Sequence, residues 1–362
     1  MAIPVLIDDL GLDRPDPTAF TRDFRPVGFV VVGMGMGRKR AAALAQTPGV
    51  RLVGVVDRDP DRAREAGDEL GVPYTNDLAP WLGRNECEVV YVLTPTGTHA
   101  AVAMPALETG KHVLLTKPME ASVAACDRLI RAAEAAGVRL AVDFERRFSP
   151  TILALRRAVA DGHLGRLLAG TIALKICRTP DYFREAGGWR GTRKMDGGGV
   201  LANQAIHHID EAVFLLGPPA RVRAETRNQN HDIEAEDIAV AVLDYSDGTF
   251  LSLVATTCWP QDTWYRRLEL HGTTGAAVVA GGGPLDRPVA RYFRDGAWTL
   301  TPPAEPEVAW AGAADNLACA LRLGAPLVAD GREARRTQAV LDALYRSADA
   351  GGTWTDVDAE LD

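Results

Sequence analysis

Short apolar runs alternate with helical patterns in the first part of the chain. Runs rich in valine and leucine predict strands at 28–32, 51–57, 88–94, 112–116 and 139–144. The segments between them have the apolar spacing of helices, at 39–45, 60–70, 99–108 and 122–136. Continuous apolar strands separated by helices are typical of a parallel sheet that is covered on both faces. We therefore expect residues 26–147 to form an α/β domain with a doubly wound parallel sheet.

The pattern changes in the second part of the chain. A predicted helix at 151–161 and a strand at 171–177 precede a glycine-rich loop and a helix at 200–216. Strands then follow one another without helices, at 221–227, 237–245, 249–257, 265–272 and 276–280. This succession predicts an α+β domain over 148–362 with a large, mostly antiparallel, open-faced sheet. Two late helices, at 308–323 and 331–349, are placed to pack back on the first domain.

Composition narrows the class of protein and of partner. The chain has 362 residues, of which 47% are hydrophobic, and a net charge of −8 at pH 7, which suits a soluble protein of two domains. Scattered basic residues predict no nucleic-acid partner. Residues 1–25 form an irregular acidic arm without the order of a secretory signal, and no apolar run reaches the roughly 18 residues of a membrane span. We expect a cytoplasmic protein that does not bind membranes.

The segment VGMGMGR, between the first predicted strand and helix, is a candidate phosphate-binding loop of a Rossmann domain. Gly33 allows the tight turn, Gly35 lets the backbone approach a pyrophosphate, and the helix start supplies N–H donors. The third position of the fingerprint has two interpretations. Either Gly37 takes it one residue early, or Arg38 occupies it and reaches the pyrophosphate or the adenosine ribose. Met36 lies between these positions.

An acidic residue at the end of the second predicted strand indicates which dinucleotide binds. Asp57 follows the glycines by about 20 residues, where a carboxylate accepts hydrogen bonds from ribose hydroxyls. The carboxylate would repel a 2′-phosphate, so NAD is the expected cofactor. Arg58, its neighbour, could bind that phosphate and keeps NADP open as an alternative.

Three further segments carry candidate chemistry at strand ends or at a helix start. They are VLTPTGTH (92–99), LLTKPME (114–120) and DGGGVLANQAIHHID (196–210). Together with the glycine loop, they resemble the motifs of the glucose–fructose oxidoreductase / inositol dehydrogenase (Gfo/Idh/MocA) family. The resemblance extends from about residue 27 to the segment that ends at 348.

The resemblance implies reversible hydride transfer between a nicotinamide and a ring carbinol of a sugar or an inositol. It assigns catalysis to Lys117, Asn203, His207 and Asp210. The cofactor set that it implies comprises the glycine-loop residues, the acidic strand end with its arginine, and Thr94, Pro95, Thr96, His99 and Lys117. A homodimer or homotetramer through the C-terminal sheet is also implied.

Oxidation of a secondary alcohol requires a base, and the sequence offers two. His207 has an ordinary pKa near 6.5, and Lys117 could have a lowered pKa near the cofactor. The family motif usually has aspartate at position 203, so Asn203 is expected to leave His207 without a carboxylate partner there. The family's glutamate before the lysine is Thr116 here, which changes the field around Lys117.

No metal is expected at this helix or elsewhere. His207 and its neighbour His208 point to different helix faces, which does not suit a shared metal. The five cysteines are widely spaced and form no CxxC pair, so neither disulfides nor a zinc site is expected.

Aromatic and guanidinium side chains gather in the segment 177–196 and suit a polyhydroxylated or anionic ligand. The expected substrate contacts are Arg147, Arg178, Tyr182, Trp189, Arg190, Asn203 and His207. Candidate substrates are a sugar, a glycoside, or an anionic sugar such as a uronate or a nucleotide sugar. Similarity to sugar 3-dehydrogenases favours oxidation at C3. The alternatives are an inositol dehydrogenase, against which Asn203 speaks, and a non-catalytic protein that senses NAD or a sugar.

Overall fold

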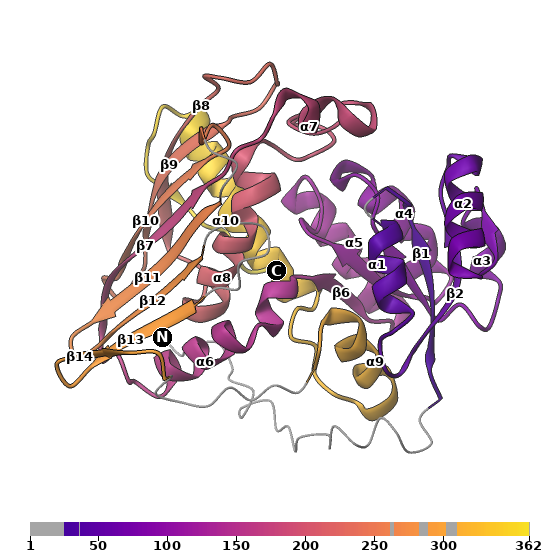
Figure 1. The fold of residues 1–362 in the computed structure, drawn as a ribbon, viewed down its shortest axis with the longest axis horizontal. Coiled ribbons are helices and arrows are strands. Elements are labelled where there is room, and N and C mark those ends of the chain that lie inside the picture. The colour runs from indigo at the N-terminus through magenta and orange to yellow at the C-terminus, as the bar shows by residue number, and fades with distance from the viewer. Residues whose placement is uncertain (1–24, 36, 261–263, 282–288, 302–309, 362) are drawn as a thin grey trace.

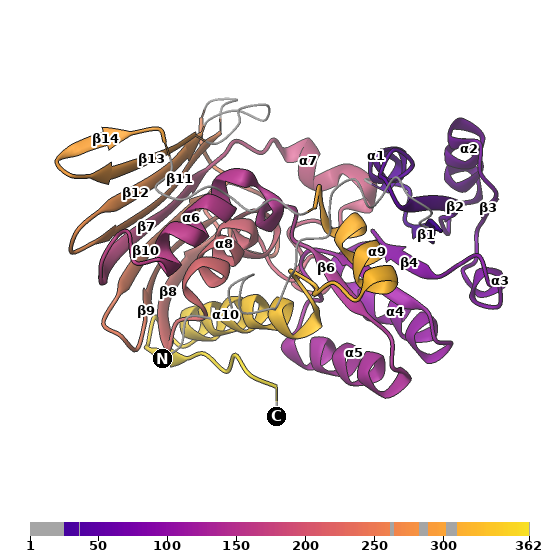
Figure 2. The same ribbon diagram turned by 90° about the horizontal axis from the view of Figure 1, so that it is seen from below.

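The structure is a computed structural model that describes residues 25–35, 37–260, 264–281, 289–301 and 310–361. Figures 1 and 2 show two domains side by side, a Rossmann domain and a domain built on a large sheet. Met36 and all but the last residue of the predicted N-terminal arm lie outside the described residues. None of the described helices combines the length and the apolar character that crossing a membrane requires.

The Rossmann domain contains the parallel sheet that the apolar runs predict. Its strands are β1 (Val27–Val32), β2 (Val50–Val56), β3 (Tyr74–Thr75), β4 (Val89–Val92), β5 (His112–Thr116) and β6 (Leu140–Asp143). Their order in the sheet is β3-β2-β1-β4-β5-β6. The order reverses between β1 and β4, so ligands are expected outside the carboxyl ends of these two strands.

Helices on both faces of this sheet begin and end at predictable residues. They are α1 (Gly37–Leu44), α2 (Pro60–Leu70), α3 (Ala79–Leu82), α4 (His99–Glu108) and α5 (Val123–Ala136). Asp59 caps α2 by accepting hydrogen bonds from the N–H groups of its first turn, and Ser122 caps α5 in the same way. Gly71 and Gly137 end these helices in the left-handed conformation that favours glycine. The short elements β3 and α3 were not predicted, because two to four residues carry too little periodicity.

The second domain contains a mostly antiparallel sheet, as predicted. Its order is β14-β13-β12-β11-β7-β10-β9-β8-β15, and only the central pair β7–β10 among the described pairings is parallel. The strands are β7 (Leu167–Lys175), β8 (Arg221–Arg227), β9 (Ile238–Asp244), β10 (Phe250–Thr256), β11 (Tyr265–Gly272), β12 (Ala276–Gly281), β13 (Val289–Arg294), β14 (Ala297–Thr299) and β15 (Thr355–Asp356). The predicted strand 171–177 is displaced, because β7 begins and ends earlier. Strands β13 to β15 were not predicted.

Helices cover one face of the second sheet, and none of the described helices lies on its other face, which we call the bare face (Figure 2). The covering helices are α6 (Pro150–Ala160), α8 (Ile206–Leu216) and α10 (Gly331–Asp349). The single helix predicted at 200–216 is divided, because Val200–Ala205 form a wider π-helical turn before α8. Such turns occur often at functional sites.

The last two helices connect the domains. Helix α9 (Ala313–Leu323) packs on strands β2, β5 and β6 of the Rossmann sheet. Helix α10 contacts α5 and β6 in the first domain and α8 and β8 in the second. Helix α10 thus connects the Rossmann domain to α8, and Asp330 caps its start.

Candidate active site

The glycine turn between β1 and α1 has the geometry that a dinucleotide needs. Gly33 has a φ of 98°, and an added Cβ would lie 2.9 Å from backbone atoms of Leu93 and Thr94, so only glycine fits. An added Cβ at Gly35 would meet no described atom within 4 Å, which leaves space beside the backbone. The residues present therefore fit a pyrophosphate bound at the start of α1.

Gly37, rather than Arg38, takes the third position of the fingerprint. Gly37 is the first residue of α1, and a Cβ there would lie 3.4 Å from Leu93. The Arg38 side chain turns away to α2, where it pairs with Glu69 and lies 3.6 Å from Glu65. Arg38 is thus held among carboxylates, which removes it from the pyrophosphate position that we considered.

Asp57 is at the expected strand end and also holds the glycine turn. Its carboxylate accepts hydrogen bonds from the N–H groups of Met34, at 2.7 Å, and Asp59, at 2.9 Å. A guanidinium N–H of Arg62 donates to it at 3.2 Å. Arg58 is exposed beside it. Arg62, from the first turn of α2, was therefore missed as the arginine that faces this carboxylate.

The segment 94–99, which follows β4, is partly exposed at its first residues and buried at its last. Thr94 and Pro95 are partly exposed, whereas Thr96 and His99 are buried. The two ring nitrogens of His99 lie 2.9 Å from the carbonyl oxygen of Thr94 and 3.1 Å from that of Met119. His99 therefore joins two loops of the protein, and the cofactor contacts of Thr96 and His99 stay predictions.

Lys117 follows β5 at a cis Lys117–Pro118 peptide and reaches the second domain. Its Nζ donates a hydrogen bond to the carbonyl oxygen of Asn203, in the π-helical turn, at 2.8 Å. Burial lowers the pKa of Lys117 to about 8, although the nearby carboxylates of Glu145 and Asp196 oppose the shift. Lys117 is thus an amine that changes charge near neutral pH.

Asn203 is bonded to a carboxylate that we did not predict. Its amide nitrogen donates to both oxygens of Asp196, at 2.7 and 2.8 Å, and its amide oxygen accepts from the Tyr182 hydroxyl at 2.8 Å. Asp196 is buried and also accepts from the N–H of Gly191 at 2.9 Å. The carboxylate expected at position 203 is therefore supplied seven residues earlier, and asparagine is the side chain that can donate to it.

Position 203 offers His207 no carboxylate, but Glu145 is a carboxylate neighbour from another element. Nδ1 of His207 lies 3.4 Å from Oε1 of Glu145. Among the described residues, this Nδ1 and Oε2 of Glu145 are buried without a hydrogen-bonding partner. Burial, then the charges of Lys117 and Arg146, hold the pKa of His207 well below its usual value. Buried polar atoms left unbonded in this way are uncommon and point to a bound molecule.

A second group of charges supports Glu145 from the Rossmann sheet. Asp143 is the β6 partner of Thr116 in the register of the sheet. It is buried, accepts a hydrogen bond from the Tyr91 hydroxyl, and lies 3.3 Å from the guanidinium of Arg40. The family motif has glutamate where this chain has Thr116. Asp143, at the end of β6, and Glu145, just after it, thus supply acidic groups near Lys117. Burial, then Asp143, raises the pKa of Glu145.

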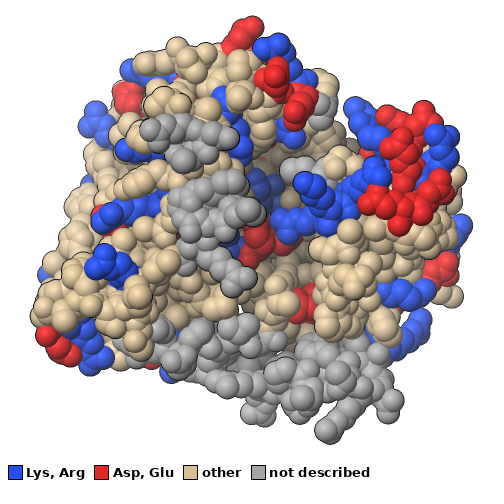
Figure 3. Space-filling view, in the orientation of Figure 1, with Lys and Arg blue, Asp and Glu red and all other residues tan. Residues whose placement is uncertain are grey.

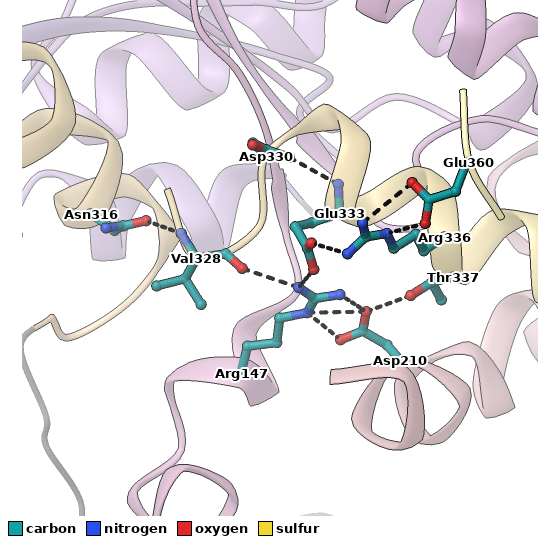
Figure 4. A network of polar contacts seen from close by, with 9 residues as sticks. All are labelled: Arg147, Asp210, Asn316, Val328, Asp330, Glu333, Arg336, Thr337 and Glu360. Atoms are coloured by element: carbon teal, nitrogen blue, oxygen red, sulfur yellow. Dashed lines mark hydrogen bonds and ion pairs between the residues drawn. The ribbon is translucent and has the colours of Figure 1, made fainter. Parts of the chain in front are cut away.

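Arg147 and Asp210 belong to the interior and do not reach the site. The guanidinium of Arg147 has no exposed area and donates to both Asp210 oxygens, at distances from 2.8 to 3.2 Å. Thr337 donates to Asp210 at 2.8 Å, and Glu333 lies 3.5 Å from Arg147 (Figure 4). The assignments of Arg147 to substrate and of Asp210 to catalysis are therefore wrong, because helix α10 seals both.

The predicted substrate segment forms a stack beside Asn203. It includes α7 (Pro180–Arg184). The guanidinium groups of Arg178 and Arg190 each lie 4.4 Å from the centre of the Tyr182 ring. Arg178 also donates to the Gln204 amide oxygen at 3.0 Å, and Arg190 lies 5.5 Å from the Trp189 ring. Gln204 was not predicted, although it adjoins Asn203.

Basic side chains line the hollow between the domains on the face shown in Figure 3. The basic residues described above come from several elements of both domains: Lys117 after β5, Arg40 on α1, Arg146 after β6, and Arg178 and Arg190 beside α7. Acidic partners reduce the charge around Lys117, and Glu185 lies 3.5 Å from Arg190, whereas the described residues include no ion pair of Arg178. The arrangement favours a polar ligand that carries negative charge.

Comparison with known proteins places both halves of the chain. Residues 27–144 match the family model described as "Oxidoreductase family, NAD-binding Rossmann fold" (GFO_IDH_MocA), and residues 152–278 match the GFO/IDH/MocA C-terminal domain. D-apiose dehydrogenase of Paraburkholderia graminis is 27% identical over 89% of this chain and 88% of its own. Inositol 2-dehydrogenase of Rhizobium meliloti is 27% identical over 89% of this chain and 96% of its own.

A solved structure is similar over almost the whole molecule. The WlbA dehydrogenase of Bordetella pertussis, in complex with NADH and UDP-GlcNAcA, superposes with a TM-score of 0.83 at 28% identity. The match covers 93% of this chain and all of the other.

Proposed function

Because this chain belongs to the GFO/IDH/MocA family of oxidoreductases with an NAD-binding Rossmann fold, we propose that it oxidises a secondary ring hydroxyl of an anionic sugar derivative with NAD. The observation that carries the proposal is the contact of Lys117 with the π-helical turn of the second domain. It places an amine with a pKa of about 8 where the two domains meet, beside the unbonded Nδ1 of His207.

The cofactor half of the site selects NAD. When bound, NAD accepts the hydride that leaves the carbinol carbon. The glycine turn and the start of α1 would hold its pyrophosphate, and Asp57 would face the adenosine ribose. The carboxylate disfavours a 2′-phosphate, whereas Arg62 reduces its charge, so the preference for NAD over NADP is expected to be modest.

Lys117 is the residue that we assign as the base. A base works best when its pKa is close to the operating pH, and the pKa of Lys117 is about 8. His207 has a strongly lowered pKa and is uncharged at neutral pH, so it accepts protons poorly. Lys117 would take the hydroxyl proton as the hydride leaves, while uncharged His207 holds the same hydroxyl by a hydrogen bond.

The substrate half of the site favours an anionic ring. Tyr182 offers a flat face between two guanidinium groups, and Arg190 and Arg178 can bind a carboxylate or a phosphate. That WlbA was solved with a nucleotide-linked uronic acid supports this choice. Oxidation at C3 rests on the resemblance of the segments WRGT, GGG and NQAIH to sugar 3-dehydrogenases.

A panel of compounds tests this proposal with the purified full chain. NAD is added to hexoses, glycosides, uronates, inositols and sugar nucleotides, and the near-ultraviolet absorbance of the reduced nicotinamide is followed. We expect the largest kcat/KM with a uronate or a nucleotide-linked uronate, and a KM raised at least about tenfold in Arg190→Ala, the loss of a charge-assisted hydrogen bond. Arg184→Ala, an exposed arginine on α7, is the matched control. Preference for a neutral polyol, or equal KM in both variants, would refute the anionic substrate.

The bare sheet face is the surface through which we propose that the chain forms a homo-oligomer. The pairing register places five exposed side chains on this one face: Val240, Phe250, Tyr265, Val289 and Trp298. Exposed apolar groups gathered on one face are typical of an association surface. Light scattering of the full chain should give a dimer or a tetramer, and Val240→Glu should give monomers. A monomer at all concentrations of the unaltered chain would refute this proposal.

A further inference from the structure

A group of metal-binding side chains lies apart from the proposed catalytic centre. It comprises His231, Asp237 and Cys258, whose ligand atoms all lie within 4.8 Å of one another. His231 is in the loop after β8, Asp237 precedes β9, and Cys258 follows β10. The first two are buried and Cys258 is partly exposed. We propose that these side chains bind a zinc ion or a similar borderline transition metal.

The hydrogen bond made by Nε2 of His231 determines the tautomer of its imidazole. Nε2 of His231 lies 2.8 Å from the carbonyl oxygen of Arg178. A carbonyl oxygen only accepts, so Nε2 must carry the hydrogen. An imidazole that donates one N–H to a backbone carbonyl and turns its other nitrogen inward has the arrangement of a metal ligand.

The inward nitrogen then faces other electron-rich atoms. Nδ1 lies 3.1 Å from Oδ2 of Asp237 and 3.8 Å from Sγ of Cys258. Backbone N–H groups of residues 229, 230 and 231 donate to the Asp237 carboxylate, and three such donors suit its ionised form. Ionised Asp237 and the Nδ1 lone pair repel one another unless a cation lies between them.

The separations suit a tetrahedral metal. Zinc bonds of about 2.0–2.3 Å at tetrahedral angles place nitrogen and oxygen ligands about 3.4 Å apart, and nitrogen and sulfur ligands about 3.6 Å apart. The separations of Nδ1 from the Asp237 oxygen and from the Cys258 sulfur, 3.1 and 3.8 Å, differ from these by a few tenths of an ångström. Zn²⁺ with one carboxylate and one thiolate has no net charge, so its burial costs little. Binding forms the zinc–sulfur bond, and the thiol proton of Cys258 leaves to solvent.

A second cysteine lies beside Cys258. Cys177 is opposite Cys258 in an antiparallel bridge. The hydrogen bonds flank this pair, from Arg178 N to Thr257 O at 3.0 Å and from Trp259 N to Ile176 O at 3.1 Å. In a pair flanked in this way the side chains are on the same face and close together. The Sγ of Cys177 is not among the ligand atoms that lie within 4.8 Å of one another, so this side chain would have to turn toward them to bind the metal.

The metal would hold the backbone of the substrate segment in place near Arg178. His231 bonds to the backbone of Arg178, and its ring lies 4.8 Å from that of Phe183 on α7. A metal that joins the loops after β8 and β10 would hold the backbone on which Arg178 is carried. This role does not depend on the proposed reaction.

Metal content and cobalt spectra test the site in the full chain. The chain is freed of metal with a chelator, dialysed against Zn²⁺ or Co²⁺, and its bound metal is measured. We expect one equivalent, with a thiolate-to-cobalt absorption band and visible bands of tetrahedral Co²⁺. Cys258→Ser should abolish the thiolate band unless Cys177 is also bound, in which case the band should halve. His231→Ala should weaken Zn²⁺ binding by more than about 100-fold, and His271→Ala, at an exposed histidine, should not weaken it.

Binding of less than one equivalent to the unaltered chain would overturn the proposal. A proton, rather than a metal ion, would then lie between the ring of His231 and the carboxylate of Asp237. Equal binding in the unaltered chain and in His231→Ala would also overturn it. Should the variants unfold, alkylation of the unaltered chain decides, because Zn²⁺ must slow the alkylation of Cys258 and leave the unfolded chain's reaction unchanged.

Discussion

Two buried charge clusters meet at α8, three residues apart, and differ in how their atoms are paired. Around Asp210, the carboxylate oxygens receive hydrogen bonds from Arg147 and Thr337, and the network closes on α10 (Figure 4). Around His207, an imidazole nitrogen and a carboxylate oxygen are buried without a hydrogen bond among the described residues. The same residue types thus stabilise the fold in one cluster and leave binding capacity in the other.

The difference teaches how to separate structural from functional charges. Closeness in sequence to a motif did not separate His207 from Asp210. What separates them is whether the bonds of each group are already made inside the protein. Groups with unmade bonds and shifted pKa values, such as Lys117 and His207, are candidates for chemistry.

We call the cluster around His207 and Lys117 the open cluster. Lys117→Met should disrupt it and have the largest effect on activity. Without the amine, turnover should fall by about 10²–10⁴-fold, the usual contribution of a general base, while NAD binding is kept. The pKa of Lys117 is lowered in the folded state, so its charged form destabilises that state below pH 8. The variant should therefore unfold at the same or a higher temperature. Lys111→Met, at the opposite end of β5, is the control and should keep activity.

We call the cluster around Asp210 and Arg147 the closed cluster. Asp210→Ala should disrupt it and affect stability instead of activity. It leaves Arg147 buried without its partner, which costs about 3–5 kcal/mol of the free energy of unfolding. Denaturant titration measures this loss. Glu360→Ala, which removes an exposed ion pair at the edge of the same network, should cost less than about 1 kcal/mol. If the folded fraction of Asp210→Ala lost turnover like Lys117→Met, the two clusters would not be separate.

Asn203→Asp sharpens the comparison within the open cluster. It would place two carboxylates in contact, because the Asn203 amide now donates to both oxygens of Asp196. We expect kcat/KM to fall roughly tenfold to a hundredfold, the cost of an unpaired buried group. The exchange Asp196→Asn with Asn203→Asp restores one donor and one carboxylate and should regain most of the activity. A double variant no better than the single one would argue against this pairing.

Asp57→Asn tests the cofactor side with the smallest expected effect. The amide keeps the size of the side chain but weakens the hydrogen bonds to Met34 N–H and Arg62. We expect the Kd of NAD to rise roughly tenfold, the value of one charge-assisted hydrogen bond, and the Kd of NADP to fall. Fluorescence titration of both reduced cofactors measures the change. An unchanged ratio of the two Kd values would show that Asp57 only supports the turn.

The sequence predicted those features that are written in contiguous segments. Both sheets follow from apolar periodicity, and the glycine turn, Lys117 and His207 lie in recognisable motifs. Asp196 and Glu145 were missed because they come from a loop and a short turn whose approach to the site depends on the packing of the two domains. Arg147 and Asp210 were misassigned because α10, far along the chain, decides their burial. Edge strands such as β3 and β15 are too short for a periodic signal.

The pH dependence of kcat/KM for the oxidised cofactor, in the presence of saturating sugar, tests the central claim most directly. If Lys117 is the base, log kcat/KM rises with pH as the ammonium loses its proton. The profile should bend at the pKa of Lys117, about 8, and level off above it. His207→Gln should lower the plateau and leave the inflection in place. A fall in activity above pH 8, or an inflection that disappears in His207→Gln, would contradict the assignment.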